Sequence, residues 1–276
     1  MNLYSIIEEI EKVDADVYER LSPRRNALKS FTSFGSKVAM AAIPLALGSV
    51  FKKAYGQTTS LSKVLDVFQF ALTLEYLEAD FYDKALNLNP LLVPSGAPRG
   101  AITTIYNHEA AHVKFLQDTI KQLGSTPGSK PVFNYIRNFP DVFTNYDTFL
   151  AVSQAFEDTG VRAYKGQAGN LMGFSAADVL TPALNIHSVE ARHASHIRQM
   201  RKARGAAVKP WITGNDTGGI GAAVQAIYNG EDLDTQAGVK ITGINGMSIS
   251  SAAATEAFDE PLTKEQVLAI VTPFIA

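Results

Sequence analysis

Residues 71–86 place acidic side chains on the apolar face of a helix, and this feature constrains the fold more than any other. One stripe recurs at steps of four and three residues: Val64, Phe68, Ala71, Glu75, Glu78, Tyr82 and Ala85. This spacing predicts a single helix, from an N-cap at Ser60 to about residue 86, whose stripe packs against other helices. Buried carboxylates are costly unless their charge is compensated, and a bound cation would compensate it.

The composition limits which cation site the chain can build. It has no Cys, so disulfides and thiolate ligands are excluded and a metal must be held by Glu, Asp or His. The net charge is −2, which gives no electrostatic basis for binding nucleic acid. A length of 276 residues allows one bundle-sized domain with additional segments, or two small domains.

Three more long helices are predicted after the first. The second spans about residues 101–123, the third begins near residue 147, and a capping box at residues 175–178 opens the fourth. Residues 124–140 are rich in Pro, Gly and Ser, which predicts a long crossover between helices two and three. Basic residues near 198–204 suit the C-terminal end of the fourth helix.

Two Glu-x-x-His motifs lie on the inward stripes of the second and fourth helices. They are Glu109 with His112 and Glu190 with His193. A spacing of three residues places a carboxylate and an imidazole on one helical face, so that both can reach one ion. One such motif is weak support for a metal site, but two on inward stripes are stronger.

The first and third helices complete an internal duplication. Glu75 precedes Tyr82 by seven residues, and Glu157 precedes Tyr164 by seven; Glu75 lies 34 residues before Glu109, and Glu157 lies 33 before Glu190. One Glu from each of two helices and one Glu-x-x-His from each of the others is the ligand pattern of di-iron carboxylate bundles. Four carboxylates and two imidazoles balance two divalent cations and suit iron, with manganese as the alternative.

Residues 58–205 resemble the ferritin-like superfamily, which includes ferritin, bacterioferritin and rubrerythrin. The stretch Leu-Glu-Tyr-Leu-Glu-Ala-Asp-Phe-Tyr at 74–82 is similar to the ferritin-like domain family that includes bacterial proteins labelled desiccation-related. Residues 257–262 and the helix after them are similar to that family's tail. The resemblance implies an all-α, ferritin-like four-helix bundle with a long crossover between helices two and three. A C-terminal cap of loops and helices over residues 206–276 follows it.

The resemblance also implies a set of site residues. The ligands of two metal ions would be Glu75, Glu109, His112, Glu157, Glu190 and His193. Glu109 and Glu190 would be bridging carboxylates. Tyr82 and Tyr164 would orient the terminal carboxylates, and we expect Tyr82 behind Glu75. A metal-free polar core, with both tyrosines simply filling space, is the alternative.

Several residues near these motifs have a different expected role. Glu78 shares the stripe of Glu75, but Gly160 occupies the equivalent position of the other half, so Glu78 is expected behind the ligands or in solvent. Three histidines near the motifs have no counterparts in the other half and are expected on the surface or behind the ligands: His108, His187 and His196. Asp158 is expected to be a helical charge that faces outward. Residues 218–221 predict a loop before a short helix at 222–228, not a nucleotide-binding fingerprint.

Residues 1–57 are expected to direct the chain to its location. An amphipathic helix at 1–21 precedes the pair Arg24-Arg25 and an apolar run at 38–51, which resembles a twin-arginine export signal and predicts a periplasmic protein. Ala27 stands where such signals usually have Phe. The alternative is a cytoplasmic protein whose N-terminal helix docks on a membrane surface or a partner.

The leading functional prediction is a di-metal centre that binds O₂ or peroxide. The chain would then be an oxidase or peroxidase in metal handling or oxidative-stress defence. A protein from a different class remains the alternative: a non-catalytic, desiccation-related stress-protection protein that keeps the bundle without turnover, because fold does not determine function.

Overall fold

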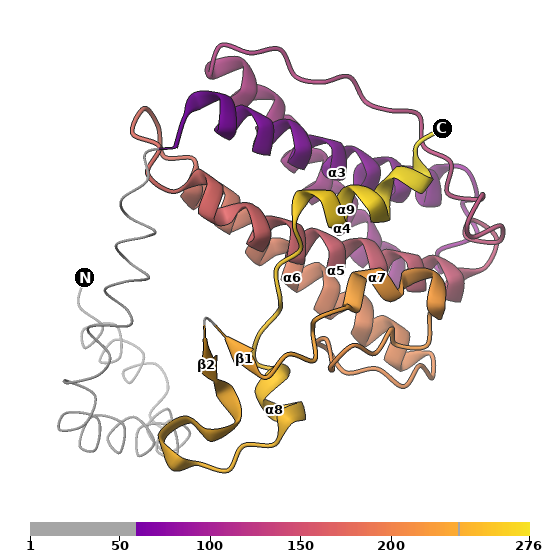
Figure 1. Ribbon diagram of the computed structural model, residues 1–276. Coiled ribbons are helices and arrows are strands. Elements are labelled where there is room, and N and C mark those ends of the chain that lie inside the picture. Colours follow the sequence, from indigo (N-terminus) through magenta and orange to yellow (C-terminus); the bar gives the residue numbers. More distant parts are fainter. Residues whose placement is uncertain (1–58, 237) are drawn as a thin grey trace, which may run out of the picture. The chain divides into compact units, whose positions relative to one another are not determined.

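Four long helices form the bundle in the computed structural model, which describes residues 59–276 apart from residue 237 (Figure 1). They are α3 (Leu61–Asn87), α4 (Ala97–Gln122), α5 (Tyr146–Leu171) and α6 (Leu180–Ala203). The all-α prediction is confirmed. The predicted N-terminal helix and export signal lie outside the described residues. In the described part, no helix has the length and apolar character that a membrane span requires.

The helix starts show which local signals decide the boundaries. The Ser60 side chain caps α3 by accepting a hydrogen bond from the Lys63 amide at 3.3 Å, as expected. Helix α4 begins four residues earlier than predicted, because Pro98 is compatible with a first helical turn. The predicted capping box at 175–178 is wrong: α6 begins at Leu180, and Asp178 accepts from the Thr181 amide at 3.1 Å instead.

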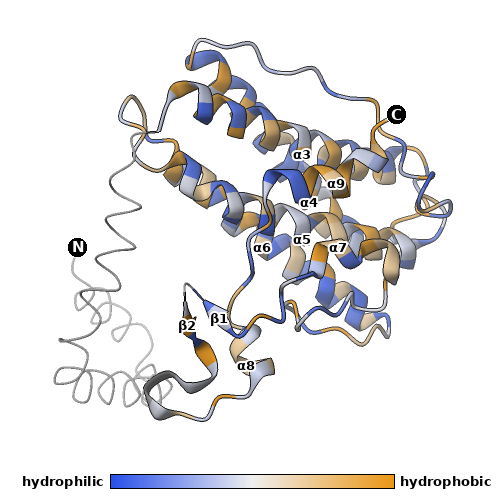
Figure 2. Cartoon of the chain, viewed as in Figure 1, coloured by the Kyte–Doolittle hydropathy of each residue, from blue (hydrophilic) through white to orange (hydrophobic). Residues whose placement is uncertain are grey.

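The core lies between the inner faces of the four helices, and each helix carries both hydrophobic and hydrophilic residues (Figure 2). Helix α5 is the most enclosed, with 17 of its 26 residues buried, whereas α4 buries six of 26. Phe81 stands at the centre of an aromatic group, with ring centroids 5.1 Å from Phe149 and 5.0 Å from Phe156. This packing fixes the rotation of α3 and α5, whose inward stripes also contain the acidic residues.

The long crossover at residues 123–145 follows α3 and then meets the C-terminus. Tyr135 donates to the Leu77 carbonyl at 2.7 Å, which anchors the crossover on α3. Phe133 pairs with Ile275 in an isolated antiparallel bridge, so the last residues of the chain continue alongside it. The predicted crossover is therefore present, and its aromatic residues belong to the core.

The C-terminal segment consists of short elements in the same compact unit as the bundle. They are η1 (Ala222–Val224), α7 (Gln225–Tyr228), β1 (Thr235–Gln236), β2 (Val239–Lys240), η2 (Ile241–Gly246), α8 (Ser251–Thr255), α9 (Lys264–Val271) and η3 (Thr272–Phe274). Strands β1 and β2 form an antiparallel pair. Helix α9 begins with the capping box expected at 263–266 and packs against α5, while its Lys264 side chain pairs with Asp66 of α3. The loop at 218–221 leads into η1 and α7, as predicted.

Buried charged residues fasten this segment to α5. Arg162 is 1% exposed and forms an ion pair of 2.8 Å with Glu231, while its guanidinium also donates to the carbonyls of Asn229 and Glu260. The outward position expected for Asp158 is wrong: it is buried, pairs with Arg198 and accepts from the Tyr228 hydroxyl. A helical pattern alone could not show this, because the C-terminal segment covers the side of α5 that would otherwise face water.

Candidate metal centre

The six predicted ligands come together in the middle of the bundle. They form two overlapping groups, each with ligand atoms within 4.8 Å of one another: Glu75, Glu109, His112 and Glu190 in one, and Glu109, Glu157, Glu190 and His193 in the other. All four carboxylates are fully buried, and the two imidazoles are 9% and 5% exposed. The helical periodicity brings this about, because each residue occupies the inward stripe of its helix.

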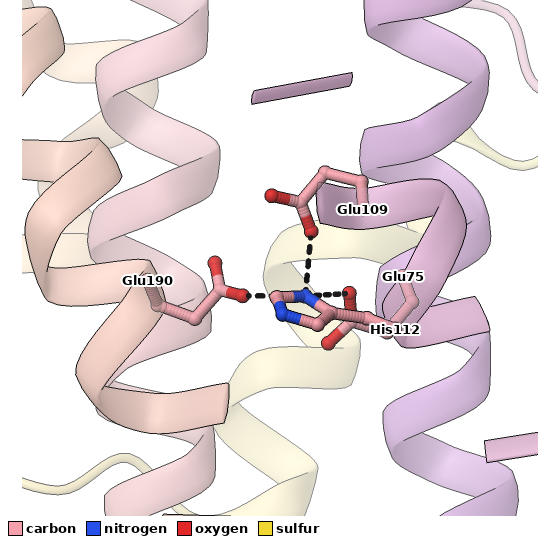
Figure 3. A group of neighbouring side chains, drawn as sticks. All are labelled: Glu75, Glu109, His112 and Glu190. Atoms are coloured by element: carbon pink, nitrogen blue, oxygen red, sulfur yellow. Dashed lines mark hydrogen bonds and ion pairs between the residues drawn. The ribbon is translucent and has the colours of Figure 1, made fainter. Parts of the chain in front are cut away.

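The first group surrounds the ring of His112 (Figure 3). Nδ1 of His112 lies 3.2 Å from Oε2 of Glu75, 3.1 Å from Oε2 of Glu109 and 3.2 Å from Oε1 of Glu190. Three helices, α3, α4 and α6, therefore direct carboxylates at one imidazole nitrogen.

The second group repeats this arrangement around His193. Nδ1 of His193 lies 2.7 Å from Oε1 of Glu109 and 3.2 Å from Oε2 of Glu157. Glu109 thus directs one oxygen to each imidazole, and Glu190 also belongs to both groups. This is the geometry that a bridging carboxylate needs, although both residues were assigned that role only through a family resemblance.

Several atoms of the centre lack proper hydrogen-bond partners. Five buried atoms accept or donate no hydrogen bond: Oε1 of Glu109, Oε2 of Glu157, both carboxylate oxygens of Glu190 and Nδ1 of His193. Some of them are within ion-pair distance of each other, but the angles do not suit hydrogen bonds. Buried polar atoms are rarely left in this way. Their convergence on one centre, from carboxylate and imidazole donors, fits divalent cations.

Several pKa values of the centre are raised, which also indicates that positive charge is favoured there. Burial and the nearby carboxylates, opposed by close contacts with the rings of His112 and His193, raise the pKa of Glu109 to about 7. Burial and the charges of Glu109 and Glu75 raise the pKa of Glu190 well above its usual range. Burial would lower the pKa of His193, but the charge of Glu157 and the close contacts with Glu109 and Glu157 raise it to about 11. When no metal is bound, these raised pKa values favour the protonated forms of the carboxyl and imidazole groups.

The two buried tyrosines cross between the halves. Tyr82 on α3 donates to Oε1 of Glu157 on α5 at 2.5 Å, and Tyr164 on α5 donates to Oε1 of Glu75 on α3. The expected pairing of Tyr82 with Glu75 is therefore wrong. A spacing of seven residues separates the two by two helical turns, so each hydroxyl reaches the facing helix instead. Each tyrosine leaves the other oxygen of its carboxylate directed at an imidazole.

His108 contacts the far side of His193. Its Nδ1 lies 2.9 Å from Nε2 of His193, and the two rings stack at an interplanar angle of 13°. A histidine that binds metal through one nitrogen usually donates from the other, and the partner fixes its orientation. Sequence reasoning placed His108 on the surface or behind the ligands without naming its partner, because only the fold brings α4 to this face of α6. His187 is half-buried and His196 is exposed, and neither belongs to the two groups.

The side chain of Glu78 on α3 lies next to Gly160 on α5. Glu78 is 2% exposed, so of the two positions expected for it, behind the ligands or in solvent, the one in solvent is wrong. Burial, followed by the charges of Glu190 and Glu157, raises the pKa of Glu78 well above its usual value, which favours a protonated carboxyl. A Cβ at Gly160 would lie 3.1 Å from Oε2 of Glu190 and 3.4 Å from Oε1 of Glu78. Glycine at this position leaves room for both carboxyl groups.

Fold and site together define a four-helix bundle with a buried carboxylate and histidine centre suited to metal binding. Residues 63–203, about half of the chain, match the model of the ferritin-like domain family. The chain belongs to this ferritin-like domain family. A search of curated proteins gave no match. The desiccation-related resemblance therefore stays a prediction.

Proposed function

We propose that this chain binds two iron ions between its four helices and acts as an oxidase or peroxidase in metal handling or oxidative-stress defence. The observation that supports this most strongly is the convergence of unpaired, buried carboxylate and imidazole atoms on one centre. A polar core that folds without metal would be expected to satisfy these atoms internally. Manganese would suit the same ligands and is the alternative metal.

The contacts support a role for each residue in holding the ions. Glu75 and Glu157 would be the terminal ligands, because a tyrosine holds one oxygen of each and the other faces an imidazole. Glu109 and Glu190, which belong to both groups, would be the bridging ligands. His112 and His193 each complete one group. Bound iron supplies the redox couple and the Lewis acidity that reactions of O₂ or peroxide need.

Metal analysis tests the centre directly. Protein purified under iron-replete conditions is expected to contain about two ions per chain, and Glu109→Gln with Glu190→Gln is expected to lose both because a neutral amide cannot bridge two cations as a carboxylate does. Asp118→Asn with Glu265→Gln removes two acids that lie outside the centre and is the matched control. Wild-type protein without metal, or a double variant at the bridging positions that keeps both ions, contradicts the proposal.

A turnover assay separates the enzyme from the non-catalytic alternative. Anaerobic protein loaded with Fe(II) is mixed with O₂ or with hydrogen peroxide, and oxidation is followed by near-UV absorbance. Repeated oxidation in the presence of a chemical reductant, faster than for the same iron concentration in buffer, supports the enzyme. Stable Fe(II), or a single oxidation without renewal, favours a stress-protection protein that binds metal passively.

For localisation we propose export by the twin-arginine route, which rests on Arg24-Arg25 and the apolar run at 38–51 alone. Replacing both arginines by lysine is expected to retain the protein in the cytoplasm of an expressing bacterium, as shown by cell fractionation. Lys52→Gln with Lys53→Gln serves as a charge control. Wild-type protein found in the cytoplasm favours the alternative, a cytoplasmic protein with a docking helix.

A further inference from the structure

A groove between α4 and α6 reaches the candidate metal centre from one side. It encloses about 830 Å³ and is lined by the first half of α4, the second half of α6 and Tyr146 at the start of α5. His193 is part of its wall. The groove therefore connects the exterior to an imidazole of the centre, on the face where the two Glu-x-x-His helices lie next to each other.

The groove is larger than a small oxidant such as O₂ requires, and part of its lining is apolar. A volume of this size is in the range of pockets for small organic molecules, whereas a water-sized molecule occupies about 30 Å³. Ala101 and Ile105 from α4 and Met200 from α6 give it an apolar surface. Hydrophobic burial along this surface favours a ligand with a hydrocarbon body.

The charged residues of the groove are all basic. They are Arg192 and Arg204, and no carboxylate lines the groove. Arg204 is already paired with Asp147 and lies over the Tyr146 ring, with 4.9 Å between its guanidinium carbon and the ring centroid. Arg192 forms no ion pair among residues 59–276 as far as they are described, and only its Nε donates to the Ser188 carbonyl. An anion would complement Arg192, whereas a metal cation would not.

We propose that this groove binds a small amphipathic carboxylate. Its carboxylate would pair with Arg192, and its hydrocarbon chain would lie along Ala101, Ile105 and Met200. Arg192 and Met200 are eight residues apart, about 12 Å along the helix, which is roughly the length of a medium-chain fatty acid. That this molecule is presented to the metal centre as a substrate rests on the proposed function, but its binding does not.

Calorimetric titration of the full chain with octanoate and with octan-1-ol tests the proposal. Octanoate is expected to bind at least tenfold more tightly than octanol, since a charge-assisted hydrogen bond to Arg192 is available only to the carboxylate. Arg192→Gln is expected to weaken octanoate binding at least tenfold and to leave octanol unchanged. Lys202→Gln removes an exposed charge of the same helix that is not in the lining, and both affinities should stay at wild-type values.

A second variant locates the binding in the groove. Ala101→Phe places a large side chain in the groove and is expected to weaken both ligands at least tenfold, with an unchanged circular dichroism spectrum. The proposal is overturned if octanoate does not bind, if both ligands bind equally, if Arg192→Gln behaves like Lys202→Gln, or if Ala101→Phe has no effect.

Metal analysis of the same samples keeps the two proposals apart. Selective octanoate binding by protein that holds no metal would support the groove and contradict the di-iron function. Two bound ions in protein that does not bind octanoate would do the reverse. With both present, octanoate is expected to alter the near-UV absorbance of the iron-loaded wild type, and not that of Ala101→Phe, because His193 lines the groove.

Discussion

The two halves of the bundle agree at the centre and differ around it. In α3–α4 and α5–α6, each half supplies one Glu that accepts from a tyrosine of the opposite half, the tyrosine that donates in return, and a Glu-x-x-His motif. Outside these residues, α5 is enclosed by the C-terminal segment while α4 has an open outer face. The duplicated residues are those that form the centre. The residues that differ determine which face of the bundle is open to solvent and where the C-terminal segment attaches.

The unequal surroundings predict the largest effect. Arg162→Ala is expected to destabilise the protein by about 3–5 kcal/mol, because Glu231 would remain as an unpaired buried charge. Urea unfolding followed by circular dichroism measures this change. Lys114→Ala, at an exposed ion pair with Asp118 on α4, is the control and should cost at most about 1 kcal/mol. If the two variants lose the same unfolding free energy, the buried ion pair that attaches the C-terminal segment to α5 contributes no more than an exposed pair on α4.

The shared chemistry predicts equal effects across the halves. Tyr82→Phe and Tyr164→Phe each remove a hydrogen bond to a buried carboxylate, and each is expected to cost about 1.5–3 kcal/mol of unfolding free energy. The two values should agree within about 0.5 kcal/mol. Tyr106→Phe, a partly buried tyrosine outside the centre, is the control. A large effect at only one of the two positions would show that the halves are not equivalent at the centre.

The difference between the two imidazoles predicts an asymmetric loss of metal. His108→Ala is expected to weaken metal binding roughly 10–100-fold, because His193 loses the partner that orients its ring. The duplication provides a matched control: Val189 precedes Glu190 as His108 precedes Glu109, and Val189→Ala should leave metal affinity unchanged because valine has no polar group to offer a ligand. Competition with a coloured chelator gives both affinities. His108→Asn, which can still accept a hydrogen bond, should recover part of the loss.

The sequence was sufficient for whatever depends on periodicity and duplication. The four helices, the crossover and the convergence of Glu75, Glu109 and His112 follow from residues at helical spacing on inward stripes. The tyrosine pairing was predicted wrongly, because it depends on how far each side chain extends toward a facing helix. Asp158 was misplaced for a similar reason: its burial is caused by Tyr228 and its neighbours, 70 residues later in the chain.

Gly160 provides the finest test of the comparison, because the duplication places Glu78 at the equivalent position of α3. Gly160→Ala is expected to weaken metal binding roughly tenfold, since its Cβ would lie 3.1 Å from Oε2 of Glu190 and this carboxylate, which belongs to both groups, would have to move. Gly169→Ala, on the same helix with open space around its Cβ, should keep wild-type affinity and gain up to about 1 kcal/mol of stability from helix propensity. If Gly160→Ala also gains stability and binds metal with wild-type affinity, the added Cβ does not displace Glu190. The absence of a side chain at position 160 is then not required for Glu78 and Glu190 to lie side by side.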